Sequence, residues 1–134
     1  RHAPRSGALS LRVLPPGRPV TARAGRAVCP LADGRTVVWE PAAPCGAIAC
    51  HAQKLDLDRP ARETLVRRYG LPRGPVAFAC AWTRAEVMGN LFGMSPWAWL
   101  ARGARAQAMR VRTTTLVRPE LGLVISLGLL PSGG

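Results

Sequence analysis

The chain has 134 residues and a formal net charge of +12, because 19 Lys and Arg residues face only seven Asp and Glu residues. Its length fits a single domain, and a hydrophobic content of 48% can form a core, which excludes a wholly disordered chain. The sequence contains no run of about 18 uncharged apolar residues, so it predicts no transmembrane helix of its own.

The basic charge is almost entirely arginine, since Lys54 is the only lysine. Arginine binds phosphate and carboxylate through a planar bidentate fork and keeps its charge when half buried. This composition therefore indicates a polyanionic or acidic partner. The codon bias of a GC-rich genome is the alternative cause, because Ala, Gly and Pro are also abundant.

The N-terminal third alternates short apolar segments with turn residues, a pattern typical of antiparallel strands. Asp33-Gly34 lies between two of these segments and predicts a tight hairpin, in which Pro30 favours an edge position for the first arm. The predicted strands cover residues 9–13, 20–24, 27–31 and 35–40.

The middle of the chain predicts a loop, a helix and a further strand. Residues 41–57 are rich in Pro and Ala and predict the loop. Asp58 is the expected N-cap of a helix over residues 59–69, which Gly70 ends. Large and small side chains alternate over residues 76–82, which favours a strand; an Ala-rich buried helix is the alternative.

Two more helices are expected after residue 82. Thr83 and Glu86 have the spacing of a capping box at the start of the first helix, and Gly93 can end it. Ser95-Pro96 is a start signal for the second helix, which we expect to continue to Val111. One side of this second helix carries an apolar stripe of Trp97, Leu100, Ala101, Ala104, Ala108 and Val111.

The C-terminal segments complete the predicted fold. Residues 113–118 and 121–130 flank Pro119-Glu120 and predict a second hairpin with a buried arm. We therefore expect a small α+β fold, in which N- and C-terminal β-hairpins pack with two or three central helices. The chain is predicted to form a single domain over residues 1–134, with extended tails at 1–7 and 131–134.

An arginine-rich surface is the strongest functional signal. The sequence has no acid between Val87 and Pro119, although arginines accumulate there. On the predicted second helix Trp99 lies opposite Trp97, near the arginines, where it could stack on a base or fill a partner's pocket. A solvated helix face with one stray Trp is the alternative. The predicted partner-binding or RNA-binding residues are Trp99, Arg102, Arg105, Arg110, Arg112 and Arg118.

The cysteines allow several interpretations. Four cysteines permit two disulfides in three pairings, and zinc would use three of them with His51. Most zinc sites pair their cysteines more closely, so free buried thiols are favoured and no metal is predicted. The cysteines are Cys29, Cys45, Cys50 and Cys80, the last of which is expected in the core.

Catalysis is poorly supported by the sequence. Only two histidines are present, and His2 is near the terminus, so a catalytic pair would have to use His51. Its neighbour Cys50 would point the opposite way on a regular strand. The sequence therefore predicts a non-enzyme without a cofactor; a small enzyme that uses Cys50 and His51 is the least favoured alternative.

Together these features predict a non-catalytic basic accessory subunit of a large assembly, whose partners are other subunits, RNA, or the surface of a membrane complex. Residues 1–32 contain six Arg and no acid, as organellar transit peptides do, so a mitochondrial location is favoured over a plastid. The assembly would be an organellar ribosome or a respiratory or photosynthetic complex. The alternative is a secreted or viral binding module stapled by two disulfides.

Overall fold

The computed structural model describes residues 10–42, 46–56, 58–102 and 110–132 of the chain. These residues contain six strands, three α-helices and one 3-10 helix. In chain order they are β1 (Leu11–Leu14), β2 (Ala27–Pro30), β3 (Thr36–Trp39), β4 (Gly46–Lys54), α1 (Arg59–Tyr69), α2 (Pro75–Phe92), α3 (Pro96–Arg102), β5 (Arg112–Arg118), the 3-10 helix η2 (Pro119–Leu121) and β6 (Leu123–Pro131).

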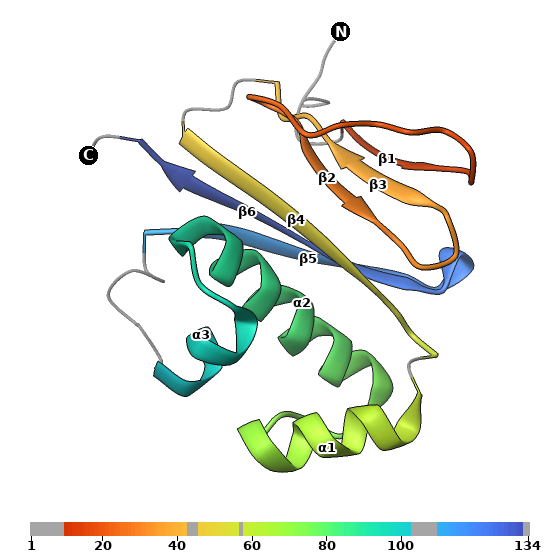
Figure 1. The fold of residues 1–134 in the computed structure, drawn as a ribbon, viewed down its shortest axis with the longest axis vertical. Coiled ribbons are helices and arrows are strands. Elements are labelled where there is room, and N and C mark those ends of the chain that lie inside the picture. Colours follow the sequence, from red (N-terminus) through yellow and green to blue (C-terminus); the bar gives the residue numbers. More distant parts are fainter. Residues whose placement is uncertain (1–9, 43–45, 57, 103–109, 133–134) are drawn as a thin grey trace, which may run out of the picture.

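The strands form two antiparallel three-stranded sheets, so the chain is a small α+β fold. The first sheet has the order β1-β3-β2 and the second has the order β4-β6-β5. Figure 1 shows the first sheet on one face of the second and the helices on the other face. The second sheet is therefore the middle layer of three, and β6 is its central strand.

The side chains of β6 explain this layering, because successive residues on a strand point to opposite faces. Leu123 and Ile125 belong to the core between the two sheets, and Ser126 meets Thr83 of α2 on the other face. Gly128 also faces α2, where a side chain would collide with Val87. Both faces of β6 are thus covered, and every residue from Leu123 to Gly128 is buried.

The predicted hairpins are confirmed. Asp33 accepts hydrogen bonds from the backbone and side chain of Arg35, at 3.0 and 2.9 Å, in the turn between β2 and β3. Gly34 has a φ of 95°, which favours glycine there. Pro30 lies on the edge strand β2, as expected. The second hairpin pairs β5 with β6 around η2.

The helix signals around α1 and α3 are also confirmed. The Asp58 carboxylate accepts a hydrogen bond from the Ala61 backbone amide, 3.3 Å away, and Gly70 ends α1 in a left-handed conformation. The Ser95 hydroxyl accepts from the Ala98 amide at 3.1 Å and caps α3. Such local signals act within one turn of helix and do not depend on tertiary contacts.

The strand predicted over residues 76–82 is wrong, because α2 contains the whole segment. The alternative, an Ala-rich buried helix, is correct. The helix continues through Thr83, which is fully buried and donates from its side chain to the Ala79 carbonyl at 2.8 Å, so Thr83 starts no helix. Alanine is compatible with both a strand and a buried helix, so the alternation of large and small side chains did not distinguish the two.

The loop predicted over residues 41–57 is also wrong, since the nine-residue strand β4 occupies most of it. Small residues in β4 suit its position, because Cys50 and Ala52 lie in the core against the first sheet. The strand predicted over residues 20–24 is absent from the described residues, where only an isolated bridge joins Arg23 to Arg26.

The long helix predicted up to Val111 is wrong. Helix α3 extends from Pro96 to Arg102, Val111 belongs to no helix, and Arg112 begins β5. Consecutive β-branched residues after Arg112 favour an extended strand over a helix. The expected tail at 1–7 lies outside the described residues. Of the tail expected at 131–134, Pro131 is the last residue of β6, and residues 133–134 lie outside the described residues.

None of the helices in the described part of the chain combines the length and the apolar character needed to cross a membrane.

Candidate functional site

The predicted arginine surface lies on a strand edge and not on a helix face. Arg112 and Arg118 are the first and last residues of β5, and Arg110 lies two residues before it. Arg102 ends α3, and Arg105 is outside the described residues. The helix predicted to carry Arg102, Arg105, Arg110 and Arg112 does not contain Arg110 or Arg112, which lie just before and at the start of β5. Arg118 lies on β5, in agreement with the strand predicted over residues 113–118.

β5 is an edge strand, and its hydrogen-bonding pattern can be derived from the register. Leu55 donates from its backbone to the Gly122 carbonyl at 2.9 Å, which continues the pairing of β4 with β6. The backbone groups of Gly122 therefore point toward β4. Because backbone groups alternate between the two sides of a strand, the N–H and C=O groups of Leu123 and of every second residue after it point toward β5. The β5 residues opposite them, from Arg118 back to Arg112 in steps of two, point their own backbone groups toward β6.

The outer side of β5 therefore presents the backbone N–H and C=O groups of Thr113, Thr115 and Val117. Among the described residues only β6 pairs with this strand. Thr113 is exposed, and Val117 is 39% exposed. We call the outward backbone groups of these three residues the open edge of β5; they lie within a strand of seven residues.

Five of the seven acidic residues form ion pairs away from β5. All seven lie within the described residues, and the ion pairs involve Asp33, Glu40, Asp56, Glu63 and Glu86. None of these pairs includes a β5 arginine. The positive charge beside the open edge of β5 thus has no carboxylate of the described chain within ion-pair distance.

A second group of arginines, the Glu40 cluster, lies on the first sheet. Glu40 accepts from Arg12 at 3.2 Å, from Arg23 at 3.3 Å and from Arg26 at 3.1 Å. The hydrogen bond from Arg26 is the main cause that lowers the pKa of Glu40, and Arg23 and Arg12 act in the same direction. One carboxylate therefore holds three guanidinium groups and partly neutralises them.

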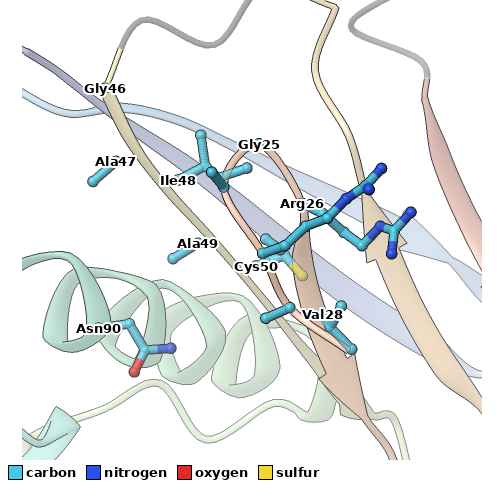
Figure 2. A pocket seen from close by; sticks show the side chains of 13 residues that line it. Gly25, Arg26, Val28, Gly46, Ala47, Ile48, Ala49, Cys50 and Asn90 are labelled. Atoms are coloured by element: carbon cyan, nitrogen blue, oxygen red, sulfur yellow. The ribbon is translucent and has the colours of Figure 1, made fainter. Parts of the chain in front are cut away.

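A pocket of about 600 Å³ lies between β4 and the turn that precedes β2. Figure 2 shows Ile48 of β4 facing the turn at Gly25, while the Arg26 side chain projects to the far side of that turn. Small residues and backbone form most of the lining, including Gly46 and Ala47. Because Arg26 reaches Glu40, it does not supply a charge to the interior of this pocket.

The two tryptophans of α3 differ from the prediction. Trp97 was expected in the core but is 45% exposed, although its ring contacts Tyr69 and Trp82 with centroids 5.9 and 5.0 Å away. Trp99 is half-buried and stacks on Phe92 of its own chain, with centroids 5.6 Å apart. Its stacking surface is thus partly used within the domain, which leaves less of it for a partner.

The structure also brings together Cys29, His51 and Glu86, a group that the sequence did not reveal. His51 lies with Nδ1 3.8 Å from the Cys29 sulfur and Nε2 3.4 Å from a Glu86 oxygen. The residues come from β2, β4 and α2, so sequence spacing could not have indicated their contact. A pocket of about 430 Å³, lined by Cys29 and His51 among others, adjoins the group.

Burial disfavours the charged form of each member of this group. It raises the pKa of the Cys29 thiol and lowers the pKa of His51 to about 4, although the nearby Glu86 carboxylate would favour a protonated imidazole. Burial also raises the pKa of Glu86. A nucleophilic cysteine needs the thiolate form, which this environment disfavours. The contacts of His51 with Cys29 and Glu86 join β4 to β2 and to α2.

The remaining cysteines add no site. Cys29, Cys50 and Cys80 are free thiols, and burial raises the pKa of Cys50 to about 12. Cys50 faces the core, away from His51, and Cys80 is half-buried on α2 rather than on a strand. Cys45 lies outside the described residues. Within the described ranges no three His, Cys, Asp or Glu residues are placed to hold a metal ion.

Comparison with known proteins gives no relative. No protein-family model matches the chain, and neither the curated proteins nor the solved structures contain a significant match.

Proposed function

We propose that this chain is a non-catalytic basic subunit that joins a larger assembly through arginines that its own acids leave unpaired. The observation that carries the proposal is the distribution of charge around β5. Arg112 and Arg118 lie on the edge strand β5 and Arg110 lies two residues before it, while none of the described ion pairs includes any of these three arginines. Unpaired guanidinium groups bind carboxylates and phosphates from another molecule at little desolvation cost.

The environment of the cysteines supports a non-catalytic function in a reducing compartment. The candidate nucleophile Cys29 and its neighbour His51 are both favoured in their neutral forms at pH 7. Three free thiols among four cysteines do not support the secreted alternative, which would require two disulfides. As the setting we propose an organellar complex, mitochondrial rather than plastid, because residues 1–32 are rich in Arg and lack acids.

Binding to defined polyanions tests the proposal. We expect the protein to bind polyglutamate or single-stranded RNA with an affinity that falls as salt rises. The double variant Arg112→Glu, Arg118→Glu should lose at least tenfold in affinity, because both charges adjoin the open edge of β5.

A matched variant separates local from total charge. Arg59→Glu, Arg67→Glu makes the same change of net charge on exposed positions of α1, and should reduce binding much less. Equal losses in the two double variants would show that only the total charge matters. Absence of binding to both polyanions would contradict the proposed function.

A further inference from the structure

We propose that the open edge of β5 binds an extended acidic segment of a partner protein, which adds to the second sheet as a fourth strand. This inference depends on the proposed function, because it assigns the class of partner that the β5 arginines bind. The sheet order would become β4-β6-β5-partner. Strand addition at a sheet edge is an established way for proteins to recognise extended peptides.

The backbone of β5 provides the first argument. Thr113, Thr115 and Val117 direct their N–H and C=O groups away from β6, as the register requires. The described register from Arg112 to Arg118 is continuous, without a bulge that would turn the edge away. The strand contains no proline, and Pro119 follows its last residue. The edge thus offers an uninterrupted set of peptide hydrogen-bonding groups.

The side chains of β5 indicate an acidic partner. Arg112 and Arg118 are six residues apart, so they point to the same face of the sheet about 20 Å from each other. Thr114 and Leu116 lie between them on this face. A partner strand with acidic residues six positions apart would place one carboxylate beside each guanidinium, where charge-assisted hydrogen bonds form.

The same geometry favours a protein segment over RNA. Single-stranded RNA is bound chiefly by aromatic stacking and by cations that follow its phosphates. β5 contains no aromatic residue, and Trp99 already stacks on Phe92. The alternating donors and acceptors of Thr113, Thr115 and Val117 match a peptide backbone, which RNA does not have.

Natural sheets protect such edges, and β5 has only part of that protection. Charged residues, prolines, bulges or covering segments prevent edge-to-edge association. On β5 the arginines at both ends repel a second copy of this basic chain, whose net charge is +12. The same charges would attract an acidic strand, so the edge selects its partner by charge.

Two peptides of identical composition test the register. The first is acetyl-Glu-Thr-Val-Thr-Val-Thr-Glu-amide, whose glutamates lie six positions apart on one face of a strand. The second is acetyl-Glu-Thr-Val-Thr-Val-Glu-Thr-amide, whose glutamates lie on opposite faces. We expect the first to bind at least tenfold more tightly in titration calorimetry or NMR titration. Equal affinities would overturn the proposed match with Arg112 and Arg118.

A backbone variant tests strand addition itself. Thr113→Pro removes one outward N–H without a change of charge, and Thr113→Val retains that N–H as a control. We expect the first peptide to bind Thr113→Val like the wild type and Thr113→Pro at least tenfold more weakly. Both variants should keep a cooperative thermal transition, because Thr113 is exposed and directs its N–H away from β6.

Polyglutamate and RNA distinguish the failure of this inference from that of the proposed function. One outcome is that polyglutamate and RNA bind the wild type, while each peptide binds Thr113→Pro as tightly as it binds the wild type. Strand addition would then be wrong, but the proposed function as a basic subunit would stand. Binding of RNA alone, unaffected by Thr113→Pro, would also overturn the acidic strand. Absence of binding to every probe would overturn the proposed function as well.

Discussion

The Glu40 cluster and the open edge of β5 are both rich in arginine, yet they differ in what surrounds the charge. In the Glu40 cluster one carboxylate accepts from Arg12, Arg23 and Arg26 within 3.3 Å. At β5 no described acid pairs with Arg112 or Arg118. The first group joins segments of its own chain, whereas the second is available to another molecule.

This difference shows that arginine content alone does not locate a binding surface. The informative property is the number of guanidinium groups that the fold leaves without an internal carboxylate. The backbone does not distinguish the two groups, because Arg12 lies on the edge strand β1 just as Arg112 and Arg118 lie on the edge strand β5. Among these two groups, only β5 combines an edge strand with arginines that no described carboxylate pairs, because Arg12 on β1 pairs with Glu40.

The largest expected loss of stability comes from the helical layer. This layer packs on one face of the second sheet, which contains β5, and the first sheet with the Glu40 cluster lies on the opposite face. Trp82 is 7% exposed and packs with Phe78 and Val66. Trp82→Ala should therefore lower the free energy of unfolding by about 3–5 kcal/mol. Trp97→Ala should lower it by less than half of this, because Trp97 is 45% exposed. Denaturant unfolding measures both, and equal losses would contradict the placement of the two rings.

Acid should weaken the scaffold that both regions share. Folded His51 has a pKa of about 4 because it is buried, while in the unfolded chain it titrates near 6.5. The unfolded state therefore binds more protons between these values, and the stability falls as pH drops from about 6.5 to about 4, by at most about 3 kcal/mol. The raised pKa of Glu86 has the opposite effect on stability. At pH values just above the usual pKa of a glutamate the folded state binds more protons than the unfolded state, so stability rises as pH drops.

His51→Gln isolates the histidine contribution. We expect this variant to lose the decline between pH 6.5 and 4 that chemical denaturation shows for the wild type. Glu86→Gln should deepen that decline, since it removes the opposing carboxyl group. An identical pH dependence in the wild type and in His51→Gln would show that the imidazole is not held in its neutral form.

A buried chain of hydroxyl groups holds β5 in place. Ser126 of β6 lies 2.7 Å from the Thr83 hydroxyl and 2.9 Å from that of Thr115 on β5. Ser126→Ala should cost about 1 kcal/mol, because Thr83 keeps its bond to the Ala79 carbonyl. Thermal unfolding should show a loss that salt does not change. A loss that disappears in salt would contradict this neutral hydrogen-bonded link.

Glu40→Gln tests the comparison with the smallest expected effect on stability, because two of the three ion pairs of Glu40 are solvent-exposed and the pair with Arg26 is only partly buried. The change releases three guanidinium groups and should create a second region that binds polyglutamate. We expect the number of bound polyglutamate chains or the salt dependence to rise in calorimetry. Unchanged binding would mean that the internal carboxylate does not decide which arginines are available.

The sequence predicted those parts of the fold that local chemistry determines. The Asp58 cap and the Asp33-Gly34 turn each act over a few residues, so their structure follows from their own side chains. β4 and the first half of α2 were missed because both are rich in alanine and small residues. Their structure depends on packing against each other and against β6, which no short window of sequence reveals.

The arginines of the candidate surface were named from the sequence, but part of their geometry was not predicted. The lack of acids between Val87 and Pro119 indicated Arg112 and Arg118 as candidates, and none of the described ion pairs includes either of them. The helix expected to carry Arg112 was wrong, because Arg112 begins a strand whose β-branched residues favour an extended structure; Arg118 was correctly predicted on a strand. The contact of Cys29 with His51 was missed, since it joins two strands of different sheets.

Amide hydrogen exchange along β5 tests the central claim most directly. In the free protein the amides of Thr113, Thr115 and Val117 should exchange much faster than those of Thr114 and Leu116, which face β6. Addition of the peptide with glutamates six positions apart should slow the three outward amides at least tenfold and leave the inward ones unchanged. Outward amides that stay fast while the peptide is bound would contradict strand addition at β5.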